Sequence, residues 1–433
     1  MARIDCKIFY QIEPEGAQAA MSNEPKKLHS HLPAAPDWLS KAELSALTPE
    51  GLAARTTALK PMLAAHAREA EAIRKPVDAV WDAIRKTGVF YHFVPKRYGG
   101  LEFDVESFVD TMLPLAEGCS STGWVTSFCV EHNWMMAQFP EKAQAEIFGQ
   151  FPYIVAPGVT QPPGKAVKAD GGYRLTGRWK WGTGVMHADW VLCTGQLPDG
   201  AMPPTIMFFA MPVSDIVILD TWNVDGMIGT GSNDIVATDV FVPEHRMLDF
   251  THMREGRAPG SLLHDNPIYK MPMLPFLALT AAIPAVGNAR NAIACFRERL
   301  KERVVFGTDA KQADKPAAQM RLAMADMQTR TAELLIRDVA RTLMTFGQRG
   351  RPAEPAERIS LRAQIAYAME LCRTAIRIVC EASGSSGHFM DNPLQRSLRD
   401  INVMSSHVVY DLDAATELHG RAMIGLPPNS PLV

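Results

Sequence analysis

The sequence predicts an α+β fold with an N-terminal helical domain, a central β barrel or sandwich, and a C-terminal four-helix bundle. Apolar residues recur at three- and four-residue spacing before residue 150 and after residue 267, as amphipathic helices require. Between them, residues 151–262 carry short strand-like runs separated by Pro- and Gly-rich turns. A chain of 433 residues with 47% hydrophobic content can bury a large core. We therefore predict domains at 36–150, 151–262 and 263–433, after an extension at 1–35.

The predicted N-terminal domain consists of several helices. Residues 44–86 are rich in Ala, Leu, Glu and Arg at helical spacing, and Gly99-Gly100 later interrupts the helical pattern. A further helix, predicted over Gly118–Gln138, is mostly apolar and yet carries Glu131 and His132. A histidine on such a face is by default a core residue with satisfied hydrogen bonds, so a structural and a functional interpretation both stay open.

The most unusual part of the predicted β domain is GGYRLTGRWKWGTGVMHADW, residues 171–190. It begins as an alternating strand after a Gly-Gly turn. Trp179 and Trp181 follow, and then Gly182, Thr183 and Gly184. Small residues let a flat ligand approach the backbone, an indole offers a stacking face, and a hydroxyl can hydrogen-bond a ring nitrogen. A barrel strand with a Gly kink and two core tryptophans is the alternative.

The predicted bundle consists of long amphipathic segments with few helix breakers. These segments are Phe276–Arg303, Met320–Gly347, Pro355–Ala382 and Asn392–Ile424. The last segment contains His407 and, four residues later, Asp411. Residues at i and i+4 share one helical face, so the carboxylate can fix the tautomer and orientation of the imidazole. The alternative is a helix-surface pair that contributes a few tenths of a kcal/mol.

The composition argues against several classes of function. A net charge of −3 gives no positive surface for nucleic acid or an anionic membrane, and no apolar run reaches the ~20 residues that a membrane-spanning helix needs. The seven cysteines are scattered without CxxC spacing, which argues against zinc and for reduced thiols. Residues 1–35 show no signal-peptide core. We therefore expect a cytoplasmic protein without a metal, nucleic acid or membrane.

Five motifs in this order resemble the acyl-CoA dehydrogenase superfamily. They are VPKRYGG (94–100), GYRLTGRWKWGTG (172–184), GMIGTGSNDIVATDVFVPEHRML (226–248), RVVFG (303–307) and SLRD (397–400). The resemblance covers about residues 40–430 and implies a flavin between the β domain and the bundle, in a homotetramer. It also matches Arg303, Phe306 and Gly307 to the family's dinucleotide or phosphate contact. An Arg beside a Phe-Gly break suits phosphate binding, and a solvated charge at a helix end is the alternative.

The base that an acyl-CoA dehydrogenase needs is missing. That base is commonly a Glu in a Tyr-Glu-Gly-Thr stretch near the C-terminus, whereas this chain reads INVMSSHVVYDLDAATELHGRAM after SLRD. Three segments are instead similar to the oxygenase component of 4-hydroxyphenylacetate 3-hydroxylase, a two-component (group D) flavin monooxygenase of the same fold. They are GCSSTGWVTSFCVEHNWMMAQF (118–139), HFMDNPLQRSLRD (388–400) and SSHVVYDLD (405–413).

This narrower resemblance implies a chemistry and a set of residues. Reduced FAD or FMN comes from a separate reductase, forms a flavin hydroperoxide with O₂, and gives one oxygen atom to an aromatic ring. Thr183 would hold the proton on a flavin nitrogen in a dry, Trp-lined cavity. His407 would contact the peroxide or the substrate, with Asp411 orienting it, and His132 would act as acid or base. The matched tryptophans, Trp124 and Trp181, are either flavin contacts or core residues.

The identity of the substrate is the least determined point. Gly158 stands where the phenol hydroxylases carry a Ser that touches the substrate hydroxyl. This departure weakens the case for 4-hydroxyphenylacetate and favours a small, neutral bicyclic such as indole, whose ring N–H could be accepted by Glu131 or His132. Phenols stay open as substrates. Two other functions also stay open, an acyl-CoA dehydrogenase-type flavin dehydrogenase and a non-catalytic flavin-binding homologue.

Overall fold

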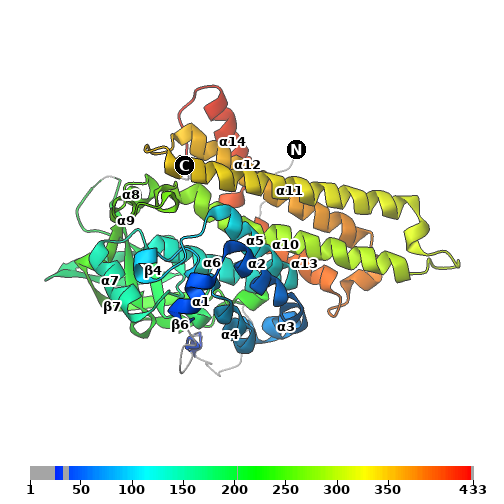
Figure 1. Cartoon of the computed structure of the whole chain (residues 1–433), viewed down its shortest axis with the longest axis horizontal. Coiled ribbons are helices and arrows are strands. Elements are labelled where there is room, and N and C mark those ends of the chain that lie inside the picture. Colours follow the sequence, from blue (N-terminus) through cyan, green and yellow to red (C-terminus); the bar gives the residue numbers. More distant parts are fainter. Residues whose placement is uncertain (1–24, 33–38, 202, 431–433) are drawn as a thin grey trace, which may run out of the picture.

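The computed structural model describes residues 25–32, 39–201 and 203–430. It confirms the predicted order of helices, β sheet and helices, with the sheet at one end of the molecule and the long C-terminal helices reaching toward the other (Figure 1). The N-terminal helices are α1 (Lys41–Ala46), α2 (Pro49–Ala58), α3 (Lys60–Ile73), α4 (Asp78–Thr87), α5 (Val105–Gly118), α6 (Ser120–Met136) and α7 (Glu141–Gln150).

Helix α6 lies in the middle of the molecule and positions the candidate site. Phe128 is the single residue of this helix that is not buried. Although α6 carries several polar side chains, nearly every face of it is inside the protein, and it packs against α5 and α10. It follows α5 directly in the chain. The extended conformation of Cys119 (φ −152°) separates the two helices. The predicted helix Gly118–Gln138 is therefore confirmed with slightly shorter ends.

The β domain is one eight-stranded sheet in the order β1-β6-β7-β3-β2-β4-β5-β8. Neighbouring strands are antiparallel except for β2 and β4. The strands are β1 (Lys27–Leu28), β2 (Gly158–Ala169), β3 (Gly172–Trp179), β4 (Trp190–Gln196), β5 (Ile206–Pro212), β6 (Val217–Leu219), β7 (Asp234–Pro243) and β8 (Met247–Asp249).

The predicted extension is partly incorporated into this sheet. Lys27 and Leu28 pair with Leu219 and Ile218 of β6, and the Ser30 hydroxyl donates to the carbonyl of Ala188 at 2.6 Å. Residues 25–32 are therefore not a loose extension. The prediction for residues 1–24 and 33–35 lies outside the described residues.

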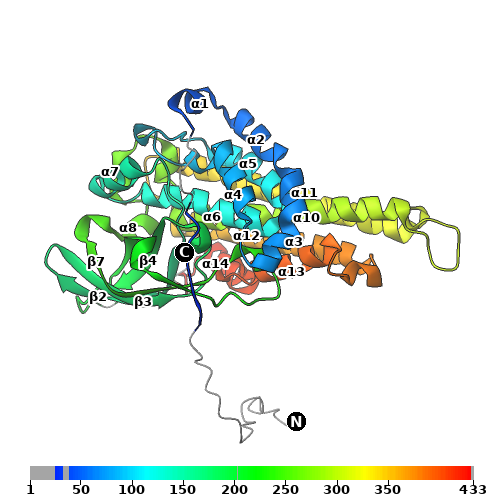
Figure 2. The same ribbon diagram turned by 90° about the horizontal axis from the view of Figure 1, so that it is seen from below.

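The C-terminal region begins with α8 (Phe250–Arg254) and α9 (Pro259–Leu263) and continues with five longer helices. These are α10 (Met273–Glu302), α11 (Pro316–Gln348), α12 (Pro355–Glu381), α13 (Pro393–Ser405) and α14 (Leu412–Met423). Helices α10 to α13 pack together as the predicted bundle. Helices α10 and α11 project well beyond the body of the molecule, and the loop that joins them lies at the far end (Figures 1 and 2).

The prediction of one helix over Asn392–Ile424 is wrong. Helix α13 ends at Ser405, a short 3-10 turn follows over Val408–Tyr410, and α14 starts at Leu412. The hydroxyls of Ser405 and Ser406 both donate to the carbonyl of Asn402. Such local side-chain bonds compete with helix continuation, and they occur here at the point where the chain turns toward α6.

The SLRD motif joins the bundle to the other two parts of the chain. The buried Asp400 carboxylate accepts hydrogen bonds from the Ser120 hydroxyl at the start of α6 and from the backbone N–H of Met227, the latter at 2.6 Å. Arg399 bonds Glu71 of α3 at 2.7 Å and the carbonyl of Asp225 at 2.8 Å. This motif therefore fixes the Gly-rich segment 226–231 against α6. None of the helices in the described part of the chain is long and apolar enough to cross a membrane.

Candidate active site

Three rings follow one face of α6 at four-residue intervals. The ring centroids of Trp124 and Phe128 lie 4.9 Å apart, and those of Phe128 and His132 lie 5.8 Å apart. Residues at i, i+4 and i+8 share a helical face, so the repeat in the sequence produces this row. The imidazole of His407 lies at the Trp124 end of this row, and the centroids of the two rings are 6.4 Å apart. The structure thus brings the two predicted functional histidines to opposite ends of one aromatic row.

His132 is held as a neutral imidazole with a defined tautomer. Its Nδ1 lies 2.6 Å from the carbonyl oxygen of Ala156, so Nδ1 carries the proton and donates. This assignment leaves Nε2 with a free lone pair. Burial of the ring lowers the pKa of His132 to about 4. At neutral pH the residue is therefore a hydrogen-bond acceptor and a potential base.

Glu131 lies beside His132 as a neutral carboxyl. Its Oε1 is 3.4 Å from Nε2 of His132, and both side chains are buried. Burial raises the pKa of Glu131 well above its ordinary value, so the two groups form a neutral contact and not an ion pair. Its Oε2 is buried with no hydrogen-bond partner in the described part of the chain. An unpaired carboxyl oxygen next to a free imidazole nitrogen is a polar position that a substrate N–H or O–H can satisfy.

Gly158 gives His132 its place. A Cβ atom at position 158 would lie 2.8 Å from Nε2 of His132, closer than real Cβ contacts occur. Residue 158 opens β2, shortly after the Ala156 carbonyl that holds the imidazole. The two predicted substrate-binding positions, Gly158 and His132, are therefore in contact.

Neutral His132 is expected to make the fold lose stability in mild acid. An unfolded histidine takes up a proton near its ordinary pKa of 6.5, whereas the pKa of folded His132 is about 4. Between these values the unfolded state binds more protons, so the free energy of unfolding falls as the pH falls. From pH 7 to pH 5 the wild type should lose about 2 kcal/mol more than His132→Gln. Urea unfolding of both proteins at both pH values measures this, and parallel losses would contradict a buried neutral imidazole.

Thr183 lies in the connection between β3 and the next 3-10 turn, at the end of a row of hydroxyls. Its Oγ1 is 2.9 Å from Oγ of Ser232, which in turn is 2.9 Å from Oγ1 of Thr230. The connection packs closely onto α6, because a Cβ at Gly184 (φ +92°) would lie 2.5 Å from the sulfur of Cys129. Sequence reasoning assigned no role to Ser232 and Thr230, although the hydroxyls in the Gly-rich stretch GMIGTGS could have indicated one.

The two tryptophans of this segment differ in environment. Trp179 is buried in the sheet core and donates to the carbonyl of Thr194 at 2.9 Å. Trp181 has a left-handed backbone (φ 64°) and is 65% exposed. Burying such a large exposed indole against a flat ligand is favourable. An exposed indole beside a partly exposed hydroxyl and two glycines fits a flavin ring. The expected dry cavity, however, is not closed within one chain, since Trp181 and His407 are both exposed.

The predicted partnership of His407 and Asp411 is corrected by the structure. Asp411 caps the N-terminus of α14 and accepts from the N–H of Ala414 at 3.0 Å. Nδ1 of His407 accepts from the N–H of Val409 at 3.4 Å. Within the described residues no hydrogen bond or ion pair joins the two side chains, because the helix that was to align them ends at Ser405. Surrounding protein still lowers the pKa of His407 to about 4 by desolvation, although solvent reaches the ring.

The predicted phosphate contact lies far from the rest of the site. Arg303 ends α10, and Phe306 and Gly307 lie in the loop at the tip of the projecting α10–α11 pair (Figure 2). Phe306 is fully exposed, and Arg303 donates to the carbonyl of Ser383 at 2.8 Å. In a single chain these residues are not brought together with Thr183 and Trp181.

Comparisons with known proteins agree with this geometry. Residues 279–412 match the C-terminal domain of acyl-CoA dehydrogenases. A pigment production hydroxylase from Rhodococcus sp. is 38% identical over 88% of this chain and 97% of its own length. The oxygenase component of the FADH(2)-dependent resorcinol hydroxylase of Rhizobium sp. is 33% identical over 87% of this chain and 95% of its own. XiaF from Streptomyces sp., solved with FADH2 and glycerol, superposes with a TM-score of 0.84 at 29% identity, covering 90% of this chain and 99% of XiaF.

The fold and these matches define a flavoenzyme built on the acyl-CoA dehydrogenase fold. Within that class, the chain belongs to the family of oxygenase components of flavin-dependent monooxygenases. The resemblance predicted from the sequence is confirmed, and the acyl-CoA dehydrogenase alternative finds no support among the relatives. The protein is an oxidoreductase that depends on flavin, and an oxygenase component works with a reductase component that supplies reduced flavin. The roles of the individual site residues stay predictions.

Proposed function

We propose that this protein hydroxylates a small, uncharged aromatic or heteroaromatic substrate, such as indole or a phenol, bound beside His132. One observation carries the proposal. His132 is buried and neutral, its Nδ1 is occupied by the Ala156 carbonyl, and its Nε2, which carries no proton, lies against Gly158 and 3.4 Å from the neutral carboxyl of Glu131. A substrate O–H or N–H can donate to this nitrogen, and removing that proton makes an aromatic ring more electron-rich.

The chain's residues fit a flavin between α6 and the β3 connection. When bound and reduced, the flavin supplies the activated oxygen that is transferred. Trp181 offers a stacking surface, and Trp124 borders the site from α6. The Thr183 hydroxyl uses one of its hydrogen-bonding positions on Ser232 and keeps others for a ring N–H. His132 accepts the substrate proton at Nε2, Glu131 offers a neutral carboxyl beside it, and His407 bonds a polar group at the other end of the row.

Product analysis with a flavin reductase, NADH, O₂ and a panel of indole and phenols tests this function. We expect an oxygenated product from at least one neutral aromatic. The absence of any oxygenated product across the panel would reject the proposed substrate class. Gly158→Ser tests the geometry of the site, because its Cβ would push against Nε2 of His132 and turnover of every substrate should fall. Turnover of phenols alone by the wild type would remove indole.

Thr183→Ala is expected to uncouple flavin oxidation from hydroxylation. Loss of a hydrogen bond worth about 1 kcal/mol corresponds to about a fivefold change in the partition between product and hydrogen peroxide. The measurement is hydrogen peroxide and product formed per NADH consumed. Thr183→Ser, which keeps the hydroxyl, should behave like the wild type. Equal peroxide from the Ala and Ser variants would rule out a role for this hydroxyl.

We also propose that the protein is a homotetramer in the cytoplasm. Helix α11 exposes large apolar side chains at Met320, Met324, Met327 and Leu334. Their spacing of four, three and seven residues puts them on one face, and a continuous apolar stripe on a projecting helix favours burial against another copy. Six free cysteines in the described part of the chain, five of them buried, support a reducing compartment. Sedimentation equilibrium and cell fractionation test these two points, and a monomer or a membrane-associated protein would contradict them.

A further inference from the structure

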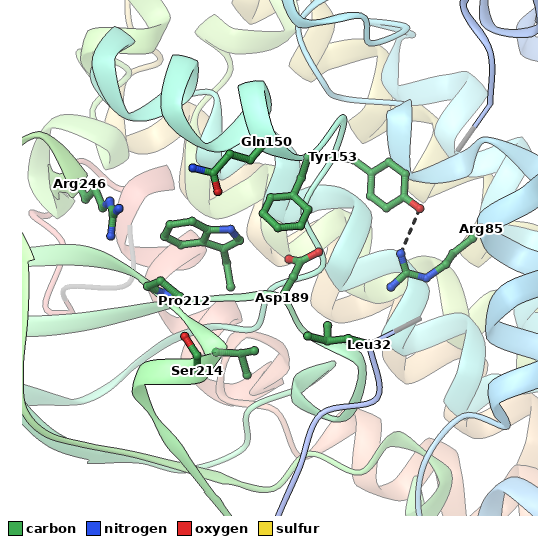
Figure 3. Close-up of a pocket in the computed structure, with 11 residues that line it drawn as sticks. Leu32, Arg85, Gln150, Tyr153, Asp189, Pro212, Ser214 and Arg246 are labelled. Carbon is green, nitrogen blue, oxygen red and sulfur yellow. Dashed lines mark hydrogen bonds between the residues drawn. The ribbon is translucent and has the colours of Figure 1, made fainter. Parts of the chain in front are cut away.

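A cavity lies apart from the candidate active site. The cavity has a volume of about 360 Å³ and opens between α4, the end of α7 and strands β4 and β5 (Figure 3). Arg85 reaches it from one side and Arg246 from the opposite side. This volume lies in the range of sites for small organic ligands, ~300–1,000 Å³. His132, Thr183 and His407 do not line it.

Arg85 is a buried cation that no carboxylate contacts directly. Its side chain is 7% exposed, and Nη1 donates to the hydroxyl of Tyr153 at 3.1 Å. Its Nε is buried and has no acceptor, and among the described residues it forms no ion pair within 4.0 Å. Arg246 differs, because Glu146 pairs with it through both oxygens. Asp189 of the same cavity attracts Arg85 over a longer distance but does not contact it. A buried guanidinium is costly unless an anion satisfies it, so Arg85 marks the position for a ligand's negative charge.

The rest of the lining suits an aromatic body with a single negative charge. Phe151, Trp190 and Val213 provide apolar surface, and the guanidinium of Arg246 covers the outer part of the Trp190 ring at 5.1 Å. Asp189 also lines the cavity, and burial raises the pKa of its carboxyl to about 7. Its ionised form disfavours a dianion such as phosphate. We propose that this cavity binds a small aromatic carboxylate, with its carboxylate paired to Arg85 and its ring against Trp190.

The cavity wall connects to His132 through two backbone residues. Asp189 accepts from the N–H of Val155 at 2.9 Å, and its own N–H donates to the Val155 carbonyl at 2.9 Å. The next carbonyl along the chain, that of Ala156, accepts the His132 proton. A ligand that shifts Asp189 thus shifts the residue that orients the imidazole.

Titration calorimetry of the flavin-free protein with benzoate tests the proposal. Arg85→Gln should weaken benzoate binding at least about tenfold, the effect of losing one charge-assisted bidentate pair. Val213→Trp should weaken it as much by filling the cavity, and it keeps the bond between Arg85 and Tyr153. Arg68→Gln, which removes an exposed arginine of α3, is the matched control and should bind like the wild type.

Three results would overturn the site. The first is no binding at millimolar benzoate, and the second is unchanged binding in Val213→Trp. The third is binding that Gly158→Val weakens and Arg85→Gln does not, because this pattern would place benzoate beside His132. Thermal melting of each variant checks its fold, and Val213→Trp decides if Arg85→Gln does not fold. A crystal of the flavin-free protein soaked with benzoate should show the carboxylate within hydrogen-bond distance of Arg85. Because the test uses no flavin and no turnover, its outcome is independent of the proposed hydroxylation.

Discussion

Replacing His132 by Gln is expected to lower the rate of hydroxylation about 10²–10⁴-fold, the range for loss of a general acid or base. The reason lies in the geometry of the neutral imidazole. The Ala156 carbonyl holds Nδ1–H at 2.6 Å, and Nε2 has its lone pair free for the substrate proton. A Gln side chain can fill part of the volume and hydrogen-bond the carbonyl, but it cannot accept a proton. The measurement is single-turnover product formation after mixing with reduced flavin and O₂.

His92→Gln is the matched control for this experiment. His92 is fully buried, its Nε2 bonds the carbonyl of Asp104 at 3.0 Å, and burial lowers its pKa to about 4 as well. It packs among Phe93, Phe103 and Phe108, away from the aromatic row of α6. Both variants should lose a comparable amount of stability, whereas only His132→Gln should lose hydroxylation. A similar loss of hydroxylation in both would reduce His132 to a packing residue.

The sequence predicted the bundle well because its pattern is long and regular. Three of the four predicted bundle helices appear as α10, α11 and α12 with ends that shift by a few residues. Strand β2 was not predicted, since Pro162 and Pro163 within Gly158–Ala169 look like a turn in a single sequence. The strand exists because it pairs with β3 on one side and β4 on the other, a long-range contact that local pattern does not contain.

The candidate site was predicted by residue type more reliably than by arrangement. Trp124 and His132 were matched to functional positions by the family resemblance, and the structure places both on one face of α6. The pairing of His407 with Asp411 used four-residue spacing and failed, because two serines ended the helix first. Contacts across elements were also invisible to local pattern, as the bond between Thr183 and Ser232 shows. A spacing argument is therefore only as good as the helix on which it depends.

Changing the tip of the α10–α11 pair is expected to abolish flavin use, although the tip is remote from Thr183 within one chain. Phe306 is fully exposed and Arg303 lies at the base of its loop. If these residues contact flavin, as the family resemblance implies, the flavin must belong to another copy of the chain. The double variant Arg303→Gln/Phe306→Ala should then weaken binding of reduced flavin by about 10–100-fold, by loss of a charged contact and an aromatic contact. Fluorescence titration under anaerobic conditions measures this affinity.

A mixed-oligomer experiment separates a shared site from a site within one chain. The double variant Arg303→Gln/Phe306→Ala and the variant His132→Gln are each expected to be inactive. The two proteins are co-expressed, or unfolded and refolded together. In a shared site, some pockets combine the intact His132 of one chain with the intact α10–α11 tip of another chain, so hydroxylation returns. In a single-chain site every pocket keeps one defect, and mixing restores nothing. Mixing His132→Gln with Thr183→Ala is the control. Both residues belong to the same pocket of one chain, so mixing should give no more product than the Thr183→Ala chains form alone, with their raised peroxide yield. Recovery in the control would show that α6 and the β3 connection belong to different pockets, contrary to the close packing of Gly184 on Cys129.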